Sequence, residues 1–162
     1  MLVKCWDLDE KRDREQCYKA PNNKYYSSEE AYQKIVKNHE WQNKCVDLYR
    51  EWIGRIDSSP SIWMKKMSQC KAYGNEVIYT AMLMSDSSAR YSVTNKTFAN
   101  EYQMAAYLWA IVNGNILEAS KRIKTKNQRE QEARNQEQSY VYEEIGENAK
   151  HNSSTIDLSK FL

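Results

Sequence analysis

Apolar residues recur at steps of three and four over residues 98–123. The positions on this line are Phe98, Tyr102, Ala105, Trp109, Val112, Ile116, Ala119 and Ile123. Such steps place side chains on one face of an α-helix, and Met104, Leu108 and Ile111 broaden that face through the middle. Gly114 costs about 1 kcal/mol relative to alanine inside a helix, but the register continues past it. We therefore predict a central helix over residues 98–123, either continuous or kinked at Gly114.

A second helical pattern covers residues 28–56. Ser27 is followed three residues later by Glu30, which is the spacing of a capping box at a helix N-terminus. The helix is expected to end between Gly54 and Asp57, because Pro60 follows shortly afterwards. One line of this helix comprises Tyr32, Ile35, His39, Gln42, Val46, Tyr49, Ile53 and Ile56, and a second comprises Trp41, Cys45, Leu48 and Trp52. We expect this helix to pack against the central helix.

Three shorter segments lie between these helices. Residues 61–70 predict a short amphipathic helix whose inward side chains are Ile62, Trp63, Met67 and Cys70. Residues 73–84 fit both strand and helix periods, and helix is favoured because no partner strand is evident nearby. Residues 85–96 are polar and predict a loop.

The two ends of the chain are more polar. In residues 1–26 the sequence Pro21-Asn22-Asn23 stands between aromatic-rich arms, which is typical of a hairpin, and mixed charges precede it on a solvated surface. Residues 124–138 are rich in helix formers and predict an extension of the central helix into solvent, or a frayed end. Residues 139–162 are polar with little predicted structure, but end in the motif Ile156-Asp157-Leu158-Ser159-Lys160-Phe161-Leu162. Its apolar side chains either dock onto the domain, the commoner outcome, or bind a partner.

Composition supports a helical domain. The 162 residues include only four glycines and two prolines, which are few for the many turns of a β-sandwich or barrel. We predict a mainly helical, all-α fold with a small N-terminal β-hairpin-like segment. The expected divisions are an irregular or hairpin segment (1–26), a helical domain (27–135), and a polar tail with the terminal apolar motif (136–162). No apolar run approaches the roughly 18 residues that span a bilayer, so we expect a cytoplasmic protein with no membrane partner.

The cysteines are scattered rather than paired. They are Cys5, Cys17, Cys45 and Cys70. Structural zinc sites use close C-x2-4-C pairs, and the sequence has none, so free thiols are favoured over both zinc and a disulfide framework. Cys5 and Cys17, on the two sides of the predicted hairpin, stay the candidates for a zinc ion, with His39, Cys45 and Cys70 as supplements. In the alternative interpretation Cys45 and Cys70 are core residues and His39 is partly buried.

Motifs of catalysis are missing from the sequence. It contains no G-x-S-x-G, no H-E-x-x-H and no glycine-rich phosphate loop. Cysteine–histidine pairs such as Cys17 with His39 occur in most chains of this length and carry no specific signal. We expect a protein that is not an enzyme and has no cofactor.

A basic stretch, hereafter the basic segment, covers residues 121–134. Its six cations are Lys121, Arg122, Lys124, Lys126, Arg129 and Arg134, and they face two acids, Glu130 and Glu132. The whole chain has a net charge of only +2, so any attraction to nucleic acid must come from such a local patch. We identify these six residues as the candidate nucleic-acid or partner-binding site. The alternative is a solvated helix end, and an acidic tail follows that opposes the patch.

Three phrases resemble a known class of proteins. They are NNKYYSSEEAYQKI at residues 22–35, FANEYQMAAYLWAIVNGNI at 98–116, and IDLSKFL at the end. They resemble small uncharacterised proteins of bacteriophages and mobile elements in Gram-positive bacteria. Similar proteins often begin with a C-x2-C knuckle, whereas here Leu8 stands three residues after Cys5.

The resemblance implies function through binding. Such proteins include DNA-associated accessory proteins and anti-CRISPR inhibitors of Cas nucleases. The expectation is therefore a phage-type accessory protein that acts on a host protein or nucleoprotein complex in the bacterial cytoplasm, most concretely an inhibitor of a Cas nuclease. The alternative is direct binding to DNA, through the basic segment, in phage replication or regulation.

Overall fold

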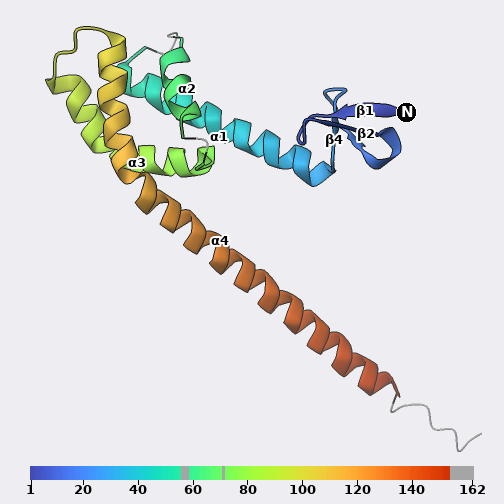
Figure 1. Ribbon diagram of the computed structural model, residues 1–162. Coiled ribbons are helices and arrows are strands. Elements are labelled where there is room, and N and C mark those ends of the chain that lie inside the picture. The colour runs from blue at the N-terminus through green and yellow to red at the C-terminus, as the bar shows by residue number, and fades with distance from the viewer. Residues whose placement is uncertain (56–58, 71, 154–162) are drawn as a thin grey trace, which may run out of the picture. The chain divides into compact units, whose positions relative to one another are not determined.

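The first long helix begins one residue later than the sequence indicates. The computed structural model describes residues 1–55, 59–70 and 72–153, and helix α1 occupies Glu29–Ile53 (Figure 1). Its N-cap is Ser28, whose Oγ accepts a hydrogen bond from the Ala31 amide at 3.1 Å. The predicted cap at Ser27 is wrong, because the Ser27 amide and hydroxyl both donate to the Asp7 carboxylate instead.

The predicted end of α1 is confirmed at Gly54. This residue has φ 67° and ψ 22°, and its amide donates to the carbonyls of Arg50 and Glu51. A left-handed glycine after the last turn is a common way to end a helix. Ile56, which the sequence places on the same helical line, is outside the described residues.

Helix α2 (Ser61–Ser68) supplies the centre of the core. Trp63 is fully buried, stacks on Tyr49 at 4.6 Å between ring centroids, and meets Trp52 and Trp109 edge-on at 6.0 and 5.2 Å. Each such aromatic pair contributes about 0.5–1.5 kcal/mol beyond its buried area. The predicted helix and its inward residues are confirmed, since Met67 is also buried, and Ile62 and Cys70 pack against the core.

Helix α3 (Asn75–Asn95) confirms the helical prediction for residues 73–84 and overturns the predicted loop over 85–96. The buried residues of its second half, Ser85, Ala89 and Ser92, are small or polar at helical spacing. The Ser85 hydroxyl donates to the Ala81 carbonyl at 2.7 Å, which satisfies its hydrogen bond inside the core. A buried face made of such residues has no strong hydrophobic period, so its sequence looks like a loop.

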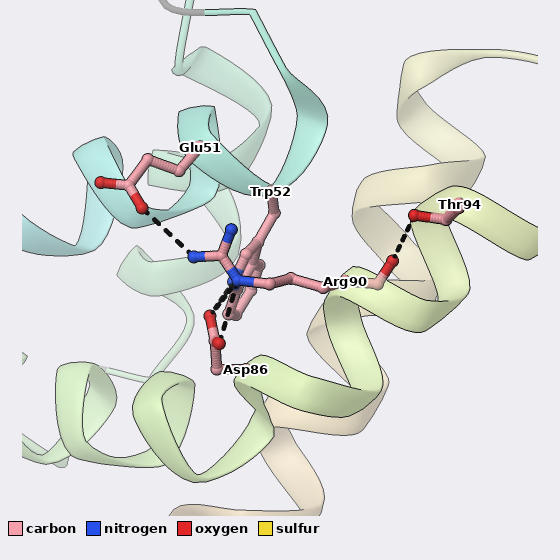
Figure 2. Close-up of polar contacts among 5 residues, drawn as sticks. All are labelled: Glu51, Trp52, Asp86, Arg90 and Thr94. Atoms are coloured by element: carbon pink, nitrogen blue, oxygen red, sulfur yellow. Dashed lines mark hydrogen bonds and ion pairs between the residues drawn. The ribbon is translucent and has the colours of Figure 1, made fainter.

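A polar cluster joins α1 and α3 (Figure 2). The Asp86 carboxylate accepts hydrogen bonds from the indole nitrogen of Trp52 at 2.8 Å and from Nε of Arg90 at 2.9 Å. The Arg90 guanidinium also reaches Glu51 at 3.2 Å. The hydrogen bond from Arg90 has the largest effect on the pKa of Asp86, and together with the bond from Trp52 it holds this pKa below its usual range. Helices α1 and α3 make extensive backbone contact with each other.

Helix α4 (Glu101–Ser153) contains the predicted central helix. It continues through Gly114, as predicted, but begins at Glu101 rather than Phe98. The buried positions of the predicted face are Ala105, Leu108, Trp109, Val112, Ile116 and Ala119. Tyr102 was predicted on that face, yet its side chain is 61% exposed because it lies in the first turn, at the edge of the core.

Hydrogen bonds link α4 to both other long helices. Tyr49 of α1 donates to Glu101 at 3.4 Å, and Asn115 of α4 donates to Ser85 of α3 at 2.8 Å. Buried side chains of α1 and α4 belong to one core, in agreement with the predicted packing of the central helix on α1. Helix α1 also makes extensive backbone contact with α3.

The far part of α4 extends the helix well beyond residue 123. The predicted extension over residues 124–138 is confirmed, and these side chains are exposed. The prediction of little structure from residue 139 onward is wrong up to Ser153, since this part is helical. The terminal motif at 156–162 lies outside the described residues. By its contacts the chain divides into Met1–Ser120 and Lys121–Leu162, and the predicted boundaries at 26 and 135 stay predictions.

The N-terminal segment forms a small four-stranded sheet of order β2-β1-β4-β3. Its strands are β1 (Leu2–Cys5), β2 (Glu10–Asp13), β3 (Tyr18–Lys19) and β4 (Tyr25–Tyr26), with a short 3-10 helix at Arg14–Gln16. Strands β3 and β4 pair antiparallel on either side of Pro21-Asn22-Asn23, so the predicted hairpin is present. Strand β1 pairs antiparallel with β2 and parallel with β4. The fold is thus mainly helical, as predicted, and its N-terminal sheet is larger than one hairpin.

Candidate nucleic-acid or partner interface

The basic segment is an exposed stretch of α4. All six of its cations have exposed side chains, and every residue from 124 to 141 is exposed as well. A helix that is polar on all sides gains its stability from charge pairs one turn apart rather than from an apolar face. The six cations identified from the sequence are therefore all accessible.

The cations do not share a single face. Arg122, Lys126 and Arg129 follow one another at steps of four and three, so they line one side of the helix. Arg134 is five residues beyond Arg129 and lies about 140° around the axis from it. A partner that binds one side of the helix thus meets three of these cations together.

Acidic neighbours reduce the field only slightly. Lys126 Nζ lies 3.9 Å from a carboxylate oxygen of Glu130, one turn along the helix, and both side chains are more than half exposed. Exposed ion pairs of this kind contribute about 0–1 kcal/mol and are weakened by salt. Within the basic segment two acids, Glu130 and Glu132, accompany six cations, so the segment itself has an excess of four positive charges.

Apolar surface follows the basic segment along α4. Tyr140 is 70% exposed and Val141 is 54% exposed. Tyrosine is enriched at interfaces because its ring gives contact area while its hydroxyl stays hydrogen-bonded. Charge followed by an exposed aromatic residue suits a protein or nucleoprotein surface.

The candidate zinc ligands lie in another environment. The Cys5 side chain is fully buried, and its thiol donates to Asp7 Oδ1 at 3.0 Å. Burial, together with this carboxylate, raises the pKa of Cys5 to about 11, so the thiol is protonated at neutral pH. Cys17 is half-buried. Within the described residues no group of three or more metal-binding side chains comes together, so the structure adds no ligand to Cys5 and Cys17.

The Asp7 carboxylate is the centre of this small network. Burial opposes its ionisation, but hydrogen bonds from Cys5 and Ser27 outweigh that effect and lower the pKa of Asp7 to about 2. Asp7 thereby connects the β-sheet to the start of α1, since Ser27 directly precedes the N-cap. No pattern in the sequence indicates this contact, because it joins residues 20 positions apart.

The supplementary zinc candidates Cys45 and His39 differ in their burial. Cys45 is fully buried, and burial raises its pKa to about 12, which agrees with the prediction of a core residue. His39 was predicted to be partly buried but is exposed, because α1 extends beyond the helical core at that point. Among the residues that the structure describes, His39 belongs to no group of three or more metal-binding side chains. All four cysteines are free thiols.

Comparisons with protein-family models, curated proteins and solved structures return no match. Among the described residues, no helix has the length and apolar character needed to cross a membrane.

Proposed function

We propose that this protein is a non-enzymatic binding protein that acts on a nucleoprotein complex of its host cell through the basic segment. The observation that carries the proposal is the exposed helical stretch of six cations, three of which line one side of α4. A nucleoprotein complex offers phosphate and acidic groups to the cations and apolar protein surface to Tyr140 and Val141.

The most concrete version is inhibition of a Cas nuclease. Its support is the resemblance of three sequence phrases to phage proteins of Gram-positive bacteria. A basic helix fits the acidic or phosphate-lined surface of such a complex by charge complementarity, which raises the association rate and excludes wrong partners. No catalytic group on this chain is required, because covering the surface is sufficient.

A cleavage assay tests this version. Purified Cas nuclease loaded with guide RNA is mixed with its target DNA and increasing amounts of the full chain. We expect the cleavage rate to fall with the wild type and to recover substantially with the triple variant Arg122→Gln, Lys126→Gln and Arg129→Gln. A matched control removes three exposed cations elsewhere, through Lys34→Gln, Lys37→Gln and Lys65→Gln, and should inhibit like the wild type. Cleavage that is unaffected by the wild type at any ratio contradicts the Cas version.

The second candidate function is direct binding to DNA through the basic segment. The excess of positive charge in this segment favours it. Each phosphate contact contributes a slope of about −0.9 to the dependence of log affinity on log salt. A salt-sensitive mobility shift with duplex DNA alone, lost on changing Lys121, Arg122 and Lys124 to Ala, would favour this candidate. No shift together with inhibited cleavage would favour the nucleoprotein target.

A further inference from the structure

One face of the N-terminal sheet gathers lysines around an exposed tryptophan. The antiparallel register pairs Lys4 of β1 with Lys11 of β2, so their side chains lie on the same face. Trp6 follows Lys4 by two positions and continues that face, while the intervening Cys5 is buried on the other side. Lys24, just before β4, reaches the same ring. We call Lys4, Trp6, Lys11 and Lys24 the Trp6 face.

The indole of Trp6 is held in place but remains accessible. Its backbone amide donates to the Tyr25 carbonyl at 2.9 Å, which anchors it beside β4. Lys24 Nζ lies 3.8 Å and Lys4 Nζ 4.9 Å from the centre of the ring. Trp6 is nevertheless 48% exposed, whereas Trp52, Trp63 and Trp109 lie in the core.

The position of Lys24 is set by a closed turn. The Ala20 amide donates to the Lys24 carbonyl at 2.9 Å, and the Lys24 amide donates to the Asn22 side chain at 3.0 Å. Asn23 takes the left-handed conformation at φ 62°, which asparagine tolerates better than most residues. The turn therefore presents Lys24 from a fixed backbone.

The charge of the Trp6 face is positive. Lys4 is paired with Asp9 at 2.7 Å. Within the part of the chain that the structure describes, Lys11 and Lys24 take part in no ion pair. Lys24 over the exposed ring and Lys11 on the same face of the sheet combine phosphate attraction with a stacking surface, which is the combination that single-stranded nucleic-acid sites use.

We infer that the Trp6 face binds single-stranded nucleic acid. One base stacks on the Trp6 indole in place of an ammonium group, and the displaced lysine then pairs with a neighbouring phosphate. Duplex DNA does not fit this role, because its bases are stacked on one another and present no ring face. An acidic peptide would satisfy Lys11 and Lys24 but would leave the ring without a flat partner. The inference does not depend on the basic segment.

Anisotropy of labelled oligomers of about 12 nucleotides, oligo-dT and oligo-U, tests the inference on the full chain. We expect at least one of the two oligomers to bind. Trp6→Leu should weaken this binding about tenfold to a hundredfold, which is the range for the loss of one stacking contact. Trp6→Phe keeps a ring and should retain most of the affinity. Lys24→Gln should weaken binding and reduce the salt slope by about 0.7, the value for one phosphate on a single strand.

The controls separate this face from other surfaces. Lys19 is opposite Tyr25 in the register of β3 and β4, so its side chain lies on the other face of the sheet from Lys24. The Lys19→Gln variant should therefore bind the oligomer like the wild type. Far-UV circular dichroism confirms that each variant is folded. The inference is overturned if neither oligomer binds, or if the folded Trp6→Leu variant binds as well as the wild type. It is also overturned if Lys19→Gln loses as much affinity as Lys24→Gln. Displacement of the oligomer by polyglutamate at equal charge concentration would contradict it as well. Loss of binding in the triple variant Arg122→Gln, Lys126→Gln and Arg129→Gln, with Trp6→Leu unaffected, would assign the activity to the basic segment instead.

Discussion

At the residue scale, two carboxylates hold elements together. Asp7 connects the sheet to the start of α1 through Ser27, and Asp86 connects α1 to α3 through Trp52 and Arg90. Both have lowered pKa values, so each is ionised in the folded protein at neutral pH. Neither contact was predicted from the sequence, because a single aspartate gives no periodic signal and its partner is distant along the chain.

The lowered pKa of Asp7 predicts how the free energy of unfolding depends on pH in acid. The pKa of Asp7 is about 2 when folded, below its ordinary value of 3.8. A lowered pKa stabilises the fold above the unfolded value, and that stability is lost as pH falls through the folded value. Asp7→Asn should reduce the free energy of unfolding by about 1–2 kcal/mol at pH 7, from weakened hydrogen bonds. Urea unfolding should show this gap to the wild type shrinking between pH 5 and pH 2.

A matched acid on α1 provides the control for Asp7. The Asp47 side chain is exposed, and its carboxylate lies 3.7 Å from the Arg50 guanidinium. Asp47→Asn should change stability by less than about 0.5 kcal/mol. A gap between wild type and Asp7→Asn that stays constant down to pH 2 would contradict the assigned pKa shift.

The Asp86 cluster is tested by a double-mutant cycle. Trp52→Phe keeps the aromatic packing but removes the indole donor, and leaves part of the Asp86 carboxylate unsatisfied. We expect a loss of about 1–3 kcal/mol in the free energy of unfolding. Because the two residues share one hydrogen bond, Trp52→Phe and Asp86→Asn together should cost less than the sum of the single changes. Strict additivity in urea unfolding would show that the contact contributes nothing.

At the element scale, the sequence predicted the helices that have large apolar faces, and it missed two helical stretches that lack one. The helices predicted over residues 61–70 and 98–123 carry tryptophan and isoleucine at helical spacing, and both were found. The second half of α3 buries serine and alanine, and the sequence of α4 beyond residue 139 is mostly polar, so neither stretch has a clear hydrophobic period. The cap of α1 shifted from Ser27 to Ser28 because Asp7 competes for Ser27.

Gly114 tests the continuity of α4. A Cβ atom added there meets nothing within 4 Å, and the backbone is helical. Gly114→Ala should therefore raise the free energy of unfolding by about 0.5–1 kcal/mol, since alanine is the better helix former. Thermal unfolding measures this as a higher melting temperature.

Gly54 provides the opposite case for the same substitution. Its φ of 67° is left-handed, so Gly54→Ala should lower stability by about 1 kcal/mol even though space is available. If both substitutions shifted the melting temperature in the same direction, the assignment of a helical Gly114 and a left-handed Gly54 would be wrong.

At the scale of the whole molecule, the sequence identified one candidate surface and missed another. The basic segment is visible as a run of charge, and the structure places all of its cations in solvent. The Trp6 face has no such run, because its lysines come from β1, β2 and the turn before β4 and meet only through strand pairing. Local charge is readable from a sequence, whereas a surface assembled by a sheet requires its register.

The central claim is that the basic segment binds a nucleoprotein target. The most direct test is the dissociation constant of the full chain for a guide-loaded Cas nuclease, measured in parallel for three proteins at one salt concentration. The account predicts that Arg122→Gln, Lys126→Gln and Arg129→Gln together weaken binding by about tenfold or more, while Lys34→Gln, Lys37→Gln and Lys65→Gln together change it by less than about twofold. Equal affinities for the wild type and the first variant, or an equal loss in both variants, would contradict it.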